Sequence, residues 1–154
     1  MDNPTQLKFR KASQGDIYRL AELRIMQLID EGYPETTGIL EDLKRYFITS
    51  LENGSLICWV GEINGEILAT AGICFYQLPS TFSNPSGRIA YITNMYTDKT
   101  YRKKGVASYL LEKLIEEAKS QNYSSVRLHA SIQGKGIYEK VGFVDTDGYM
   151  GMSL

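Results

Sequence analysis

Residues 101–118 read YRKKGVASYLLEKLIEEA, and the rest of the fold can be worked out from them. Three cations, at 102–104, precede Gly105. After that glycine, apolar side chains recur every three or four residues, with charged residues between them. This spacing predicts an amphipathic helix that starts at the basic turn. Its apolar stripe comprises Val106, Ala107, Leu110, Leu111, Leu114, Ile115 and Ala118.

The start of this helix is suited to binding an anion. Backbone N–H groups in a first helical turn lack partners, and the helix dipole adds positive potential there. Arg102, Lys103 and Lys104 add charge, Gly105 permits close approach of the backbone, and Ala107 keeps the turn uncrowded. The pattern suits a pyrophosphate. A solvated basic turn ahead of an ordinary helix has the same composition, so this alternative stays open.

Upstream, the sequence predicts a short strand and two helices. Leu7 and Phe9 alternate with basic residues, as in a strand. Residues 13–16, Ser-Gln-Gly-Asp, resemble a capping box ahead of a first helix. Residues 30–35 contain glycine and proline and break that helix. Thr36 or Thr37 is the expected cap of a second amphipathic helix.

The clearest local signal is a β-hairpin. Two β-rich runs, Leu56 to Ile63 and Glu66 to Tyr76, flank Asn64-Gly65, a dipeptide that favours a type I′ turn. Arg88 to Thr97 is the next predicted strand. After the helix we expect a strand around residues 126–130, a short helix from about Lys135 to Val141, and one or two short strands between Phe143 and Leu154.

Composition limits the classes of function. The chain has 154 residues, enough for a real core in one domain spanning 1–154. The net charge of -1 argues against a nucleic-acid partner. No apolar run reaches the roughly 20 residues of a membrane span, and the start does not resemble a signal peptide. Two cysteines and one histidine make neither a disulfide framework nor a zinc site expected. We therefore expect a reduced, cytoplasmic protein with no metal.

Two motifs together resemble one known superfamily. The residues at 102–107, Arg-Lys-Lys-Gly-Val-Ala, resemble the R/Q-x-x-G-x-G/A signature of the GNAT acetyltransferases. About 36 residues later, Tyr138 opens a segment similar to the Tyr-x-x-x-Gly-Phe signature of the same superfamily. The resemblance covers roughly residues 7–152. It implies an α+β GNAT fold, with a mixed, mostly antiparallel sheet of six or seven strands and about four helices.

The resemblance also implies a cofactor site for acetyl-CoA. In that family the strand before the basic turn splays from its neighbour and pairs with the pantetheine arm. By analogy, Met95 and Thr97 offer backbone hydrogen bonds, and a backbone N–H near Met95 or Tyr96 polarises the thioester carbonyl. The pyrophosphate is expected against Arg102, Lys103, Lys104, Gly105, Val106, Ala107 and Ser108. Ser131 stands where many members carry asparagine, so its contact with the cofactor departs from the family pattern.

Tyr138 matches the family's general acid, which protonates the departing thiolate. The general base is not evident, because Thr93-Asn94 stand where some relatives carry glutamate. Asp30, Glu31 and Glu35 lie where the family binds acceptors, and they either attract a cationic amine or form a solvated acidic loop.

The expected activity is direct transfer of acetyl to an amine of a small molecule or peptide. An acyl-CoA-binding pseudoenzyme or sensor with the same fold is the alternative. A homodimer is possible by analogy.

Overall fold

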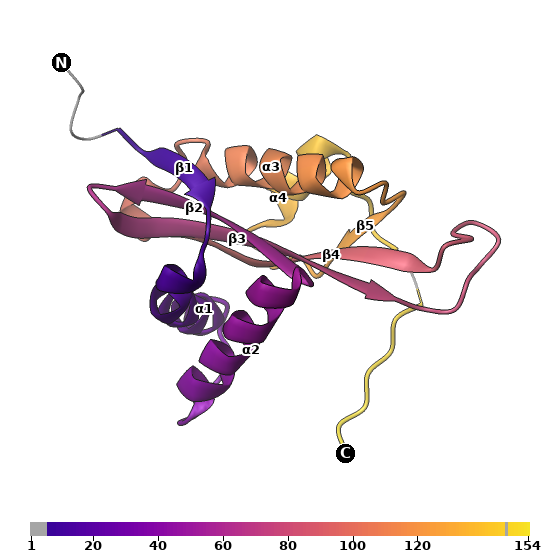
Figure 1. The fold of residues 1–154 in the computed structure, drawn as a ribbon, viewed down its shortest axis with the longest axis horizontal. Helices are drawn as coiled ribbons and strands as arrows, with labels where there is room; N and C mark the ends of the chain where they lie inside the picture. Colours follow the sequence, from indigo (N-terminus) through magenta and orange to yellow (C-terminus); the bar gives the residue numbers. More distant parts are fainter. Residues whose placement is uncertain (1–5, 147) are drawn as a thin grey trace.

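The computed structural model describes residues 6–146 and 148–154, and its strands form one sheet (Figure 1). The strands lie in chain order, β1-β2-β3-β4-β5. Neighbours are antiparallel except β4 and β5, which are parallel. The strands are β1 (Lys8–Lys11), β2 (Leu56–Ile63), β3 (Glu66–Gln77), β4 (Arg88–Thr97) and β5 (Val126–Leu128).

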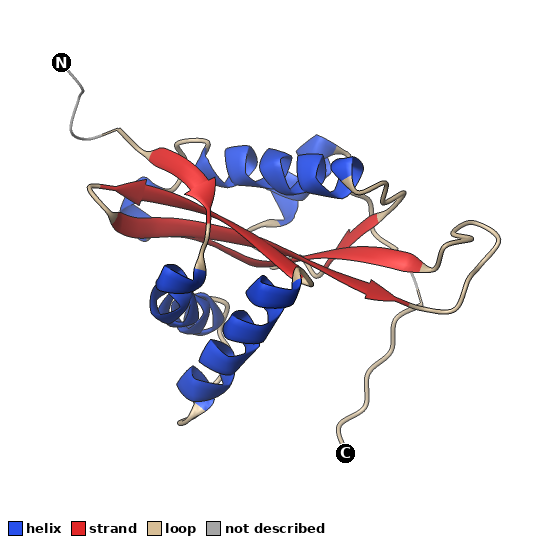
Figure 2. Cartoon of the chain, viewed as in Figure 1, coloured by secondary structure: helices blue, strands red, loops and turns tan. Residues whose placement is uncertain are grey.

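Four α-helices cover the two faces of the sheet, and Figure 2 shows the strands between them. Two packed clusters hold the helices in place: the larger lies under α3 and Tyr138 of α4, and the second lies under α1 and α2. The helices are α1 (Ile17–Asp30), α2 (Ile39–Asn53), α3 (Val106–Ser120) and α4 (Lys135–Val141), with short 3₁₀ turns η1 (Gln14–Asp16) and η2 (Lys99–Tyr101).

Local sequence chemistry explains most of these boundaries. Asn64 and Gly65 both have positive φ, 51° and 82°, as a type I′ hairpin requires. Asp16 accepts a hydrogen bond from the Ser13 N–H at 2.8 Å, which is the reciprocal half of the expected capping box. The expected threonine cap of α2 is wrong, because Gly38 occupies the N-cap position with φ 94°.

The strand count was also overestimated. The described part of the chain has five strands, not six or seven. The missing strands were expected in the tail after Phe143, but residues 143–146 and 148–154 form none. Val144 and Met150 are 80% and 98% exposed there. A segment that buries so little apolar surface gains little from pairing with the three-residue β5. The α+β class and the mixed, mostly antiparallel sheet are confirmed.

No helix within residues 6–146 and 148–154 is long and apolar enough to cross a membrane.

Candidate active site

A β-bulge in β4 shapes the centre of the sheet. Thr70 pairs with Tyr96 and Gly72 pairs with Thr93, so three steps along β4 match two steps along β3. The extra residue is accommodated at Asn94, which has φ 55° and is 5% exposed. Asparagine tolerates this left-handed conformation better than most residues with a side chain.

The bulge reverses which face of the sheet each β4 side chain occupies. Before it, Ala90 and Ile92 pack in the cluster under α3. After it, Met95 packs against that cluster and Tyr96 belongs to the cluster under α1 and α2. Because strand side chains alternate with period two, one inserted residue produces this change of phase.

The sheet opens between β4 and β5. Their paired residues end at Ile92 and Leu128, and Leu128 is also the last residue of β5. β4 continues through residues 93–97, so along this stretch one backbone edge has no partner strand within the described chain. An extended ligand could pair there by adding hydrogen bonds to the free edge.

The basic turn lies directly beyond this open edge. Gly105 is the N-cap of α3, with φ 79° and no side-chain cap. The first bond of the helix runs from the Tyr109 N–H to the Gly105 carbonyl at 3.0 Å. The N–H groups of residues 106–108 therefore precede the helical ladder and lack partners within it. A Cβ added at Gly105 would meet no atom within 4 Å, so the space at this N-cap position is open.

Arg102 turns away from this open space. Its Nε donates to the Thr97 carbonyl at 2.9 Å and its Nη2 donates to the Asp30 carboxylate at 2.7 Å. Its guanidinium also lies 5.6 Å from the centre of the Tyr96 ring. Arg102 thus ties the basic turn to the end of β4 and to the end of α1. One lone pair of the Thr97 carbonyl is already used by this contact.

The two lysines of the turn remain on the surface. Lys103 is exposed and has φ 60°. Lys104 is exposed and its ammonium lies 5.2 Å from the centre of the Tyr101 ring. Ser108 is exposed and Ala107 is half-buried, whereas the Val106 side chain is buried in the core. For Val106 only the backbone N–H is open to a ligand.

Tyr138 is buried on α4, and its ring belongs to the cluster that includes Val106 and Leu110. Burial raises the pKa of its phenol to about 12, and the negative charge of Glu31 adds to the effect. Glu31 belongs to the end of α1, below the sheet, whereas α4 lies above it (Figure 1). The charge of Glu31 thus disfavours the phenolate of Tyr138 from the other side of the sheet, where the pairing of β4 with β5 ends at Ile92.

Ser131 supports the turn that leads into α4. Its hydroxyl accepts a hydrogen bond from the Gly134 N–H at 3.1 Å, and its carbonyl accepts from the Lys135 N–H at 3.1 Å. A Cβ at Gly134 would lie 3.1 Å from the Tyr138 ring and 3.2 Å from the Ser131 hydroxyl. Ser131 and Gly134 therefore set the position of Tyr138.

The three acidic residues after α1 have different surroundings. Arg102 and Lys99 both pair with Asp30, and the hydrogen bond from Arg102 is the main reason that the pKa of Asp30 is lowered. Glu31 accepts a hydrogen bond from the amide of Gln27 at 3.1 Å. Glu35 is exposed on the connection to α2. Of the three, Glu31 is the one whose charge adds to the raised pKa of Tyr138.

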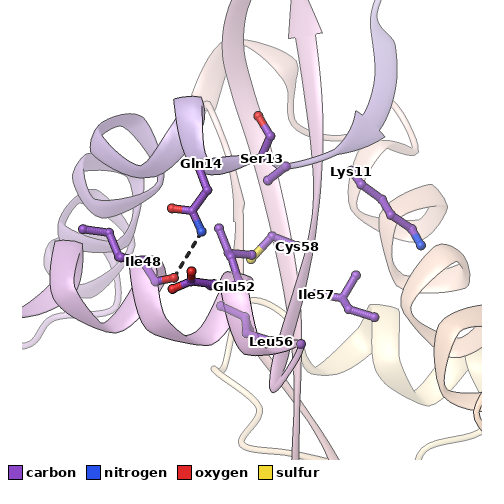
Figure 3. Close-up of a pocket in the computed structure, with 11 residues that line it drawn as sticks. Lys11, Ser13, Gln14, Ile48, Glu52, Leu56, Ile57 and Cys58 are labelled. Atoms are coloured by element: carbon purple, nitrogen blue, oxygen red, sulfur yellow. Dashed lines mark hydrogen bonds between the residues drawn. The ribbon is translucent and has the colours of Figure 1, made fainter.

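A cavity of about 680 Å³ lies elsewhere, between η1, the end of α2 and the start of β2 (Figure 3). It is near the β1 edge of the sheet, whereas the opening described above is between β4 and β5. Burial raises the pKa of the Cys58 thiol in its wall to about 12, so this cysteine is a poor nucleophile at neutral pH. Cys58 and Cys74 are both free thiols.

Two features of this site could not be read from the motifs. The partner of Arg102 is Asp30, which lies 72 residues away in the chain. The link between Glu31 and Tyr138 crosses from one face of the sheet to the other. The bulge left a weak signal, an asparagine within a β-rich run, because asparagine is enriched among residues with positive φ.

Comparisons with known proteins agree with this geometry. Residues 22–143 match the model of the acetyltransferase (GNAT) family. A predicted acetyltransferase of Clostridium acetobutylicum, solved with acetyl-CoA, superposes with a TM-score of 0.93 at 42% identity over 96% of each chain. A GCN5-related N-acetyltransferase of Ralstonia eutropha gives a TM-score of 0.89 at 22% identity, over 96% of this chain and 99% of that one.

A curated relative is more distant. It is the glucosamine 6-phosphate N-acetyltransferase of Arabidopsis thaliana, which is 29% identical over 79% of this chain and 88% of its own. The family match covers most of the described fold, including the basic turn and Tyr138. The chain is an acyltransferase and belongs to the GNAT family of acetyltransferases.

Proposed function

We propose that this enzyme transfers an acetyl group from acetyl-CoA directly to a primary amine of a small molecule or peptide. The observation that carries the proposal is the open edge of β4, which leads on one side to an uncapped helix N-terminus and on the other to a buried tyrosine. The similar Clostridium acetobutylicum protein was solved with acetyl-CoA, which supports the choice of co-substrate.

The residues present fit an acetyl-CoA site. The free edge at residues 93–97 would pair with the pantetheine arm, chiefly through the backbone of Met95 and Tyr96. The N–H groups of residues 106–108 would receive the pyrophosphate, with Lys103 and Lys104 neutralising its charge. Arg102 would chiefly position the turn, because two of its five N–H donors are directed to the Thr97 carbonyl and the Asp30 carboxylate.

Acetyl-CoA supplies an activated acyl group, a thioester. Tyr138 would donate its phenolic proton toward the departing sulfur. Its pKa of about 12 ensures that the proton is present at neutral pH. However, a thiol has a pKa near 8.5, so complete transfer is uphill by about 3.5 pKa units, or about 5 kcal/mol. Tyr138 therefore acts chiefly as a hydrogen-bond donor to the sulfur as negative charge develops.

Neutralisation of Glu31 would strengthen this donor. Its negative charge helps to raise the pKa of Tyr138, so a cation bound at Glu31 would lower that pKa again. An incoming amine in its ammonium form could provide this charge. Binding of the acceptor would in this way make the phenol a better acid at the moment it is needed.

Tyr138→Phe tests the proposal. The ring and its packing against Phe143, at 5.9 Å between centroids, are retained. Acetyl-CoA affinity should change little, whereas turnover with any accepted amine should fall by about 10²-fold, the usual scale for one lost acid. Thiol release measured with a chromogenic disulfide follows the reaction. Full activity of the variant, with chemistry rate-limiting, would remove Tyr138 from the mechanism.

A further inference from the structure

A hydrogen-bonded line of side chains runs along α1 to Glu31. The Arg24 Nη1 donates to the Gln27 Oε1 at 3.0 Å, and the Gln27 Nε2 donates to the Glu31 Oε1 at 3.1 Å. Spacings of three and four residues place the three side chains on one side of the helix. Gln27 is buried, which is unusual for glutamine in a surface helix, and both ends of its amide are used.

Arg24 carries a charge that no carboxylate balances. It is half-buried, yet no aspartate or glutamate among the described residues lies within salt-bridge distance of it. Arg10, Arg19, Arg45 and Arg102 each pair with at least one carboxylate. Arg88 and Arg127 also lack a carboxylate partner among the described residues, but each lies over a tyrosine ring, Tyr123 and Tyr149 respectively. Holding an unbalanced cation partly out of water is unfavourable unless an anion joins it.

Two tyrosines lie on elements that pack against α1, Tyr46 on α2 and Tyr91 on β4. Tyr91 on β4 faces α1 and α2, because its neighbours Ala90 and Ile92 face α3 and strand side chains alternate. Tyr46 lies on α2 and is 43% exposed. Burial raises the pKa of both phenols, and the charge of Arg24 acts in the opposite direction on both. A guanidinium fork combined with phenolic hydroxyl donors is suited to an oxyanion.

We propose that the acceptor of this enzyme is an amine that also carries an oxyanion group. Arg24, with Tyr46 and Tyr91, binds the oxyanion, and Glu31 holds the ammonium beside Tyr138. This inference rests on the proposed function, since it names the substrate class of the same site. Arg24 and Glu31 are separated by seven residues, or roughly 10 Å along a helix. The amine and the oxyanion should therefore be several bonds apart, farther than in an α-amino acid.

Matched acceptors test the inference on the intact enzyme. Comparing the rates with glucosamine 6-phosphate and glucosamine measures the effect of a phosphate on the acceptor. Comparing the rates with 6-aminohexanoate and hexylamine measures the effect of a carboxylate. At least one anionic acceptor should have a kcat/KM at least 10-fold above that of its neutral partner. Arg24→Gln should reduce that ratio by about 10-fold or more, the scale for loss of a charge-assisted hydrogen bond. The ratio is read within one variant, so a general loss of folded enzyme cancels.

Arg45→Gln is the matched control, because Arg45 is an exposed arginine paired with Asp42 on α2. It should leave the ratio unchanged. Equal rates for anionic and neutral amines, or a ratio that survives Arg24→Gln, would overturn this inference while the transferase activity itself stands. If acetyl-CoA binds and none of a broad panel of amines releases thiol, the proposed function fails instead, and this inference fails with it. The pair that shows the preference identifies the oxyanion as phosphate or carboxylate.

Discussion

Two glycines allow the proposed cofactor site to be separated from ordinary helix capping. Gly105 and Gly38 are the N-caps of α3 and α2, each a helix of 15 residues. Their conformations are alike, with φ 79° and ψ 4° at Gly105 and φ 94° and ψ 2° at Gly38. A Cβ would meet nothing within 4 Å at either position. Only Gly105 belongs to the basic turn.

Replacing each glycine by alanine should cost the same stability. A side chain in the left-handed region costs about 1–2 kcal/mol, and the reduced freedom of the unfolded chain returns about 0.4–1 kcal/mol. With no clash to add, the net loss is about 1 kcal/mol. For a chain of this size that corresponds to a fall in Tm of about 2–4 °C. Urea unfolding of Gly105→Ala and Gly38→Ala measures it.

The two variants should differ in cofactor binding. The new methyl group at Gly105 enters open space at the start of α3, where the N–H groups of residues 106–108 are proposed to receive the phosphates. Loss of one hydrogen bond to a charged phosphate is worth about 1.5–3 kcal/mol, which is about 10- to 100-fold in Kd. Calorimetric titration with acetyl-CoA should show this loss for Gly105→Ala and wild-type affinity for Gly38→Ala. Equal affinities in the two variants would refute the role assigned to the turn.

Two further predictions concern the elements that place the site. The carboxylate of Asp30 has a lower pKa in the folded protein than in the unfolded chain, where its pKa is near 4. Its pairing therefore stabilises the fold fully above about pH 4. That stability is lost as the pH falls through the pKa of Asp30 in the folded protein. At pH 7 the unfolding free energy of Asp30→Asn should be about 1 kcal/mol lower than that of the wild type. This difference should shrink below about pH 4. A difference that stays constant down to pH 2 would contradict the ion pair. At the bulge, Asn94→Val places a β-branched residue at φ 55° and should lower the unfolding free energy by about 2 kcal/mol. Asn94→Gly should lower it by less. If the urea midpoints of the two variants fall in the reverse order, the bulge does not require this conformation.

Much of the secondary structure was predictable because its causes are local. The Asn64-Gly65 turn, the stripe of α3 and Gly142 after α4 each depend on residues a few positions apart. The bounds of β2 and β4 were predicted to the residue, and α4 agrees with the helix expected from about Lys135 to Val141. The tail was predicted incorrectly because short apolar runs such as Phe143-Val144 become strands only if a partner strand and a core are available.

The sequence by itself determined the family, through a basic turn and a Tyr-x-x-x-Gly-Phe segment that both follow from chain-local patterns. It also placed the candidate cofactor contacts on the end of β4 and the start of α3. The roles assigned to those residues remain predictions.

Only the tertiary structure decided how the charges are shared. Arg102 could not be distinguished from its lysine neighbours in the sequence, yet it is bound to Asp30 and Thr97 while they face solvent. Nothing in the sequence marks Arg24 among the arginines, and its lack of a carboxylate partner among the described residues is visible only once the elements are packed. Electrostatic energy depends on distance in space and on burial. A linear pattern records neither quantity for residues far apart in the chain.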